Sequence, residues 1–215
     1  MKWKAILFDR DGTLFDSLPV ILRSFNHAIE PFTDKRPANE QWFAAFGPSE
    51  PKVLAHFVGA ERQMQAYERF LRYYREHIAE VILCEGVLPL LLKLKNAGVL
   101  LALFTGGGRV STQICLENSG MISLFDVWIT GDDVEHPKPD AEGVLKAMEL
   151  LRVNPQETLV IGDAASDVSA GKSAGATTVL ARWCRGQSVD KLPTAPDFVF
   201  DSVSELEDFL LKTEV

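Results

Sequence analysis

The sequence predicts an α/β protein with a doubly wound parallel sheet and an inserted α-helical cap domain. Three observations lead to this fold class. Six short apolar runs alternate with helical patterns, polar clusters follow four of these runs, and a long helical segment separates the first run from the second. Strands that are covered on both faces are apolar at consecutive positions. Their alternation with helices indicates right-handed βαβ units on one parallel sheet.

The six apolar runs are the expected strands. They span residues 4–8, 99–104, 126–130, 158–162, 177–181 and 197–200. Helical patterns occupy residues 88–98, 109–120, 140–151, 166–175 and 204–212. Gly98 ends the first of these helices, as a C-terminal capping glycine does. These elements together describe a Rossmann-like core.

The connection between the first two strands is much longer than a crossover helix requires. Residues 17–82 are helical in pattern throughout, so we expect them to form the cap, with 1–16 and 83–215 as the catalytic core. One helix of the cap carries a stripe of apolar residues at helical spacing: Met64, Tyr67, Phe70, Leu71, Tyr74 and Ile78. Such a stripe favours the interior of a small helical bundle over a ligand site.

Composition narrows the class of protein. The 215 residues carry a net charge of −8, and the cap holds eight basic and eight acidic residues, so the excess negative charge lies in the core. This charge argues against a nucleic-acid surface. The three scattered cysteines form no CxxC pair, which favours a reduced, cytoplasmic setting over a disulfide framework.

No segment has the pattern of a targeting or membrane sequence. The basic N-terminus has too few apolar residues for a signal peptide. The most apolar region, residues 81–104, is interrupted by Glu85, Lys93, Lys95 and Gly98, so we expect no membrane span. The sequence is compatible with a monomer or a homodimer.

Polar clusters follow four expected strands. Asp9 and Asp11 come after the first, residues 105–109 after the second, 136–140 after the third, and 162–167 after the fourth. In an open α/β sheet, ligands bind beyond the carboxyl ends of the strands. A single strand-end aspartate is more often a helix cap or turn residue, and Asp167 could cap its own helix. Four clusters at the same edge instead favour a site.

The residue types in these clusters suggest phosphoryl transfer. Asp9, Asp11, Asp163 and Asp167 offer hard oxygen ligands and point to Mg²⁺. Thr105 offers a hydroxyl, and the glycines that follow it, Gly106 among them, leave backbone N–H groups open to an anion. Lys138, between two prolines, offers a fixed positive charge for a phosphate or for the carboxylates.

At these positions the sequence resembles the haloacid dehalogenase-like hydrolases, in their phosphoglycolate-phosphatase and β-phosphoglucomutase branch. The stretches DRDGTLFDS, FTGG, HPKPD and IGDAASDVSAGKSAGA are similar to the four motifs of that family, in the same order. The resemblance covers nearly the whole chain. It implies an α/β core with a mobile cap, and phosphoryl transfer through an aspartyl phosphate.

The resemblance also implies roles for individual residues. Asp9 matches the nucleophile, and Asp11 matches the acid/base, whose backbone carbonyl also binds Mg²⁺. Thr105 and Lys138 match the pair that holds the phosphate. Asp163 matches a magnesium ligand. Asp167 matches either a magnesium ligand or a carboxylate that contacts the ligands without binding the metal. With Asp9 and Asp11, these two complete the predicted metal set.

Three positions depart from the family pattern. Arg10 stands between the two aspartates where the family usually has an apolar residue, and it could contact substrate or have a surface or ion-paired role. Lys138 is followed by Pro139 but lacks the second proline of the usual motif. Glycine replaces the asparagine that often follows the threonine of the second motif. None of these changes removes a group that the chemistry requires.

The substrate is less well defined by the sequence. FGPSEPK, residues 46–52, resembles the specificity loop of the family, with Ser49 and Lys52 as candidate contacts. For either residue taken singly, a turn that begins the next helix with Ser49 as its N-cap is the favoured explanation. We expect a Mg²⁺-dependent phosphatase of a small phosphomonoester such as phosphoglycolate. The alternatives are a β-phosphoglucomutase-like phosphomutase and, more remotely, a receiver domain that accepts a phosphoryl group without enzymatic turnover.

Overall fold

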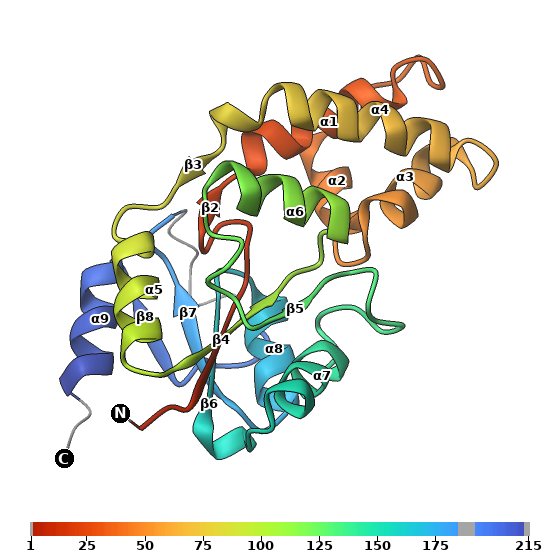
Figure 1. Cartoon of the computed structure of the whole chain (residues 1–215). Helices are drawn as coiled ribbons and strands as arrows, with labels where there is room; N and C mark the ends of the chain where they lie inside the picture. Colours follow the sequence, from red (N-terminus) through yellow and green to blue (C-terminus); the bar gives the residue numbers. More distant parts are fainter. Residues whose placement is uncertain (1, 185–191, 213–215) are drawn as a thin grey trace.

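The computed structural model describes residues 2–184 and 192–212 of the chain. A six-stranded parallel sheet forms its centre, in the order β5-β4-β1-β6-β7-β8 (Figure 1). The strands are β1 (Ala5–Phe8), β4 (Leu100–Phe104), β5 (Val127–Ile129), β6 (Thr158–Gly162), β7 (Thr177–Ala181) and β8 (Phe198–Phe200). Each predicted strand is present, with ends that differ from the prediction by one residue at most.

Helices cover both faces of the sheet, as the consecutive burial of the strands requires. One face packs against α5 (Val87–Asn96), α6 (Arg109–Asn118) and α9 (Val203–Lys212). The other packs against α7 (Glu142–Leu151) and α8 (Ala165–Ser173). The doubly wound α/β fold class is therefore confirmed.

The cap consists of α1 (Leu18–Ile29), α2 (Asn39–Ala45), α3 (Glu50–Val58) and α4 (Gln63–Glu76), followed by the 3-10 turn η1 (Ile78–Glu80). These helices share a hydrophobic cluster of their own, centred on side chains such as Phe25, Trp42 and Phe70. Met64, in contrast, is 54% exposed, so the predicted stripe is wrong at its first member. Met64 lies in the first turn of α4, at the edge of the bundle.

Helix α6 lies between the cap and the sheet (Figure 1). Its residues Cys115 and Leu116 belong to the cluster on the sheet, whereas Ile114 belongs to the cap cluster. Helix α6 therefore packs on both the cap and the core.

Two short strands connect the cap to the core. Strand β2 (Phe15–Asp16) pairs antiparallel with β3 (Ile82–Leu83), so the two segments that link the cap to the core lie side by side. This ribbon was not predicted from the sequence, although it lies at the predicted boundaries of the cap. Those boundaries stay a prediction, and part of the predicted core, residues 1, 185–191 and 213–215, lies outside the described residues. No described helix combines the length and hydropathy that a membrane span requires.

Candidate active site

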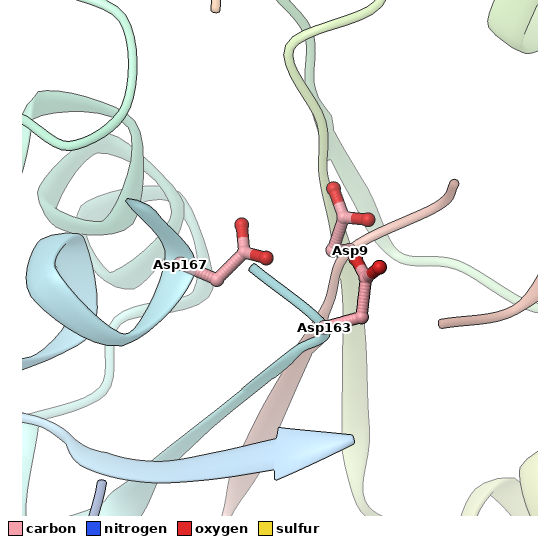
Figure 2. Close-up of side chains that lie close together, drawn as sticks. All are labelled: Asp9, Asp163 and Asp167. Carbon is pink, nitrogen blue, oxygen red and sulfur yellow. The ribbon is translucent and has the colours of Figure 1, made fainter. Parts of the chain in front are cut away.

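Three aspartates converge at the carboxyl ends of the central strands β1 and β6 (Figure 2). Asp9 directly follows β1, Asp163 directly follows β6, and Asp167 lies in the first turn of α8. One carboxylate oxygen from each lies within 4.8 Å of the others, and all three residues are buried. The pairing of β1 with β6 brings together residues that are more than 150 positions apart in the chain.

Lys138 reaches this group from the loop between β5 and α7. Its Nζ donates to Asp9 Oδ1 and to Asp167 Oδ1, at 2.6 Å each. The side chain is only 7% exposed and its ammonium lies 4.0 Å from the centre of the Phe104 ring. Burial alone would lower the pKa of Lys138, but Asp167 and Asp9 raise it above its ordinary value. Lys138 is therefore held as a cation.

The carboxylates carry more negative charge than the lysine offsets. Burial raises the pKa of Asp9 to about 7; Lys138 opposes this rise, and Asp167 and Asp11 add to it. Asp167 is already engaged through both oxygens, since its Oδ2 accepts from the Ala164 N–H at 3.0 Å. The site therefore suits a further positive charge near Asp9 and Asp163.

Gly12 allows Asp163 to approach the loop after β1. Gly12 has a φ of 93°, in the region that favours glycine, and a Cβ there would lie 2.2 Å from Asp163 Oδ2. A larger residue would therefore displace a carboxylate of the site.

Thr105 and Gly106 follow β4 and lie at the same edge of the sheet. Thr105 is buried, and its Oγ1 accepts from the Gly107 N–H at 3.1 Å, so its own proton can be donated elsewhere. A Cβ on Gly106 would lie 2.8 Å from the Gly47 carbonyl oxygen, so the cap loop approaches the core closely here.

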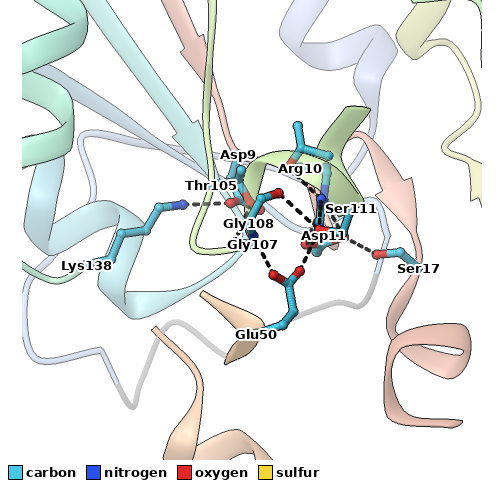
Figure 3. A network of polar contacts seen from close by, with 11 residues as sticks. Asp9, Arg10, Asp11, Ser17, Glu50, Thr105, Gly107, Gly108, Ser111 and Lys138 are labelled. Carbon is cyan, nitrogen blue, oxygen red and sulfur yellow. Dashed lines mark hydrogen bonds and ion pairs between the residues drawn. The ribbon is translucent and has the colours of Figure 1, made fainter. Parts of the chain in front are cut away.

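Asp11 is held by two neighbours (Figure 3). Arg10 donates to it from Nε, at 3.0 and 2.9 Å, and from Nη2 at 2.7 Å, and Ser17 Oγ donates at 2.5 Å. Arg10 is 1% exposed and also donates from Nη1 to Thr112 Oγ1 at 2.7 Å. Of the two uses that the sequence left open for Arg10, the structure shows the ion pair.

Glu50 joins the cap to the start of α6, a contact that the sequence analysis missed (Figure 3). Its Oε2 accepts from the Gly108 N–H at 2.7 Å, and its Oε1 accepts from Ser111 Oγ at 2.5 Å. Burial raises the pKa of Glu50 above its ordinary value, although Arg10 and these hydrogen bonds oppose the rise. Glu50 lies within the FGPSEPK stretch, but nothing in the sequence indicates this contact, because the partners of Glu50 lie far away in the chain.

A cavity of about 640 Å³ lies between the cap and these residues; we call it the active-site cavity. The core contributes Asp9, Arg10, Asp11, Thr105, Gly106, Lys138, Asp163 and Asp167 to its lining. Two predicted cap contacts, Ser49 and Lys52, are not among the described residues that line it. Ser49 is the buried residue directly before α3, and Lys52 is exposed.

The roles of these residues stay predictions. Comparisons with known proteins identify the family of the chain. The model of the haloacid dehalogenase-like hydrolase family matches residues 6–181. The pyrophosphatase PpaX of Bacillus mycoides (strain KBAB4) is 32% identical over 208 residues, which cover 96% of this chain and 96% of that protein.

Solved structures show the same fold. A hydrolase from Pseudomonas syringae superposes with a TM-score of 0.82 at 23% identity, over 99% of this chain and 100% of that one. CbbY from Rhodobacter sphaeroides in complex with phosphate gives a TM-score of 0.81 at 24% identity, over 95% and 96% of the two chains. A mutant of CbbY in complex with xylulose-(1,5)-bisphosphate gives 0.79 at 25% identity, over the same shares. The chain thus belongs to the family of haloacid dehalogenase-like hydrolases, the family that its four motifs predicted.

Proposed function

We propose that this chain is a Mg²⁺-dependent phosphatase that hydrolyses a small phosphomonoester through an aspartyl phosphate on Asp9. The observation that carries the proposal is the convergence of Asp9, Asp163 and Asp167 in the lining of the active-site cavity, with the ammonium of Lys138 bound to Asp9 and Asp167. A phosphomonoester is a dianion that repels a carboxylate nucleophile, so the site needs fixed positive charge before attack can occur. Lys138 supplies part of that charge.

Magnesium fits the rest of the site. Asp9 and Asp163 present only hard oxygen donors, they are buried, and their charge is not fully offset by Lys138. We assign the metal to these two carboxylates and to the backbone carbonyl of Asp11. Asp167, with both oxygens on protein donors, orients Lys138. When bound, Mg²⁺ would offset the charge of the phosphate and polarise the phosphoryl oxygens.

In the proposed mechanism, each of these residues has its own step. One oxygen of Asp9 forms a bond to phosphorus while the bond from phosphorus to the ester oxygen breaks, and Asp11 gives its proton to the departing alcohol. Asp11 next takes a proton from water, whose oxygen attacks phosphorus and releases phosphate from Asp9. The hydroxyl of Thr105, the N–H of Gly106 and Lys138 hold the phosphoryl oxygens throughout.

The names of relatives suggest which substrates to test first. Phosphoglycolate is the ester that the family resemblance favours. Pyrophosphate is a second candidate because PpaX, at 32% identity, is called a pyrophosphatase. The CbbY mutant that was solved with a sugar bisphosphate supports phosphate esters in general. No feature of the cap favours a phosphomutase, and membership of a hydrolase family argues against a receiver domain.

Acid-quench mass spectrometry tests the covalent step. The enzyme is mixed with acetyl phosphate and Mg²⁺, quenched within milliseconds, and digested. We expect a phosphoryl adduct on the peptide that contains Asp9, a larger amount of it in Asp11→Asn, and none in Asp9→Asn. Asp16→Asn, outside the active-site cavity, is the matched control and should behave as the wild type. Turnover by Asp9→Asn at more than a few per cent of the wild-type rate would remove Asp9 as the nucleophile.

A further inference from the structure

The wall that the cap contributes to the active-site cavity is mainly apolar. Its side chains come from α1, α2, the loop after α2, and α3; they are Leu18, Ile21, Phe25, Phe43, Phe46 and Val53. Phe43 is 45% exposed, although a large aromatic ring is normally covered. Apolar side chains that line a cavity beside a few fixed polar groups are typical of a pocket for an apolar part of a ligand.

The cap brings no positive charge to this wall. It holds eight basic residues, and none of them is among the described residues that line the cavity. Lys52, in the loop expected to recognise substrate, is exposed. Arg23 instead pairs with Glu80, and Arg69 donates to the His27 carbonyl at 3.0 Å.

The two basic residues of the core that line the cavity are already occupied. Arg10 is engaged by Asp11, Thr112 and Ser111, and Lys138 by Asp9 and Asp167. Five carboxylates line the same cavity, including Glu50 on its cap side. One divalent metal would leave no surplus of positive charge after a phosphate dianion has bound. A second anionic group on the substrate would therefore be desolvated next to carboxylates, at a high cost.

We infer that the natural substrate is a phosphomonoester of an uncharged, largely apolar alcohol, whose aliphatic or aromatic group packs on the cap wall. This inference rests on the proposed phosphatase function and makes it more specific. It disfavours phosphoglycolate and pyrophosphate, since the part of each molecule that would face the cap is anionic.

A series of n-alkyl phosphates from propyl to heptyl tests the inference. The alcohols of this series have nearly the same acidity, so differences in rate report on the binding of the chain. Each methylene that packs on the wall should raise kcat/KM by roughly threefold to fourfold, mainly through KM, until the wall is filled. Analogues of equal length that end in a carboxylate should react at least about tenfold more slowly in kcat/KM.

A charge placed on the wall should change this preference. In Phe43→Lys, the ratio of kcat/KM for the carboxylate-ended ester to that for the alkyl ester should rise by about tenfold, because the new ammonium pairs with the carboxylate. Phe43 is a suitable position because its side chain is already part exposed. Leu150→Lys is the matched control: Leu150 is 63% exposed on α7 and does not line the cavity, so the ratio should stay at the wild-type value.

Acetyl phosphate separates failure of the inference from failure of the proposed function. Its leaving group is too short to fill the wall and needs no proton, so its turnover reports on the phosphoryl chemistry alone. Turnover of acetyl phosphate together with a flat alkyl series, or with faster cleavage of phosphoglycolate or pyrophosphate, would overturn the inference and leave the function standing. If neither acetyl phosphate nor any monoester is turned over, the proposed function fails and the inference fails with it.

Discussion

At the scale of single residues, Arg10 stands where the family usually has an apolar side chain, and the structure gives it a specific task. Its guanidinium donates three hydrogen bonds to Asp11 and is itself fixed by Thr112 of α6. A planar guanidinium can hold a carboxylate through two of its N–H groups at once, whereas a lysine ammonium cannot. Arg10 thus fixes the side chain of Asp11, and we propose that it positions Asp11 for its role as the acid/base.

Replacement of Arg10 should therefore resemble a loss of acid/base function. In Arg10→Lys, we expect kcat for propyl phosphate to fall by up to about 10²-fold, because the departing alkoxide needs a well-placed proton donor. The rate constant for formation of the aspartyl phosphate from p-nitrophenyl phosphate should fall much less, because p-nitrophenolate departs without a proton. Single-turnover kinetics with both esters measures the difference.

The control for this experiment is Ser17→Ala, which removes a single hydrogen bond to Asp11 and should give a smaller effect of the same kind. Circular dichroism and thermal unfolding verify that each variant folds, since loss of one partner of a buried ion pair costs roughly 3–5 kcal/mol. Equal losses on both esters in a folded Arg10→Lys would show that Arg10 is structural only.

At the scale of elements, the contact between α3 and α6 ties the cap to the core through one carboxylate. Glu50 occupies the first turn of α3 and accepts from Gly108 and Ser111 at the start of α6. Acceptors at a helix N-terminus are favourable because they satisfy backbone N–H groups that have no partner within the helix. Burial nevertheless makes ionisation of Glu50 costly, so this contact should depend on pH.

The pH dependence has a definite sign. Because the pKa of Glu50 is raised in the folded protein, the folded state holds the proton more tightly than the unfolded state does. Ionisation therefore lowers the free energy of unfolding as pH rises from the ordinary value of 4.5 through the raised pKa. In Glu50→Gln this loss is absent, so the stability of the variant relative to wild type should increase with pH over that window and then level off.

Urea unfolding of both proteins across this range measures the difference. Ser111→Ala provides a check. The hydrogen bond from Ser111 opposes the rise in the pKa of Glu50, so its loss should extend to higher pH the range over which stability falls. A constant difference between Glu50→Gln and wild type, or one that decreases with pH, would contradict the assignment.

Some of these elements could be predicted from the sequence and others could not. The four inner strands of the sheet are buried on both faces, so their consecutive apolar residues are visible in the sequence, and the aspartates that follow β1 and β6 share an edge by topology. The ribbon of β2 and β3 was missed because two residues per strand leave no pattern. Glu50 was missed because its partners lie 58 and 61 residues away, and only the packing of the cap on the core brings them together.

At the scale of the whole molecule, the described residues form three hydrophobic clusters, one in the cap and one on each face of the sheet, and the ribbon and α6 join the cap to the core. The active-site cavity lies where cap and core meet, and it gathers five carboxylates in a protein that already carries a net charge of −8. Repulsion among these groups opposes folding when no cation is bound. Metal binding should therefore affect stability as well as activity.

We expect Mg²⁺ at about 100 times its Kd to stabilise the folded protein by roughly 2.7 kcal/mol, and so to raise Tm by about 5–10 °C. In Asp163→Asn most of this rise should be lost. In EDTA, Asp163→Asn should unfold at the same temperature as the wild type or at a higher one, because the variant lacks one of the repelling charges. Asp140→Asn, an exposed position near Lys138, is the matched control and should respond to Mg²⁺ as the wild type does.

Activity measurements with the same proteins test whether these carboxylates hold the metal that hydrolysis requires. EDTA should abolish hydrolysis by the wild type and Mg²⁺ should restore it. Ca²⁺ should also raise Tm but should support little turnover, because its larger and less regular coordination shell would not hold the phosphoryl group at the distance that attack by Asp9 requires. Full activity in EDTA, or an equal rise in Tm on adding Mg²⁺ to wild type and to Asp163→Asn, would show that these carboxylates do not hold the metal. The negative charge of the cavity would then have to be balanced by Lys138 and Arg10 alone.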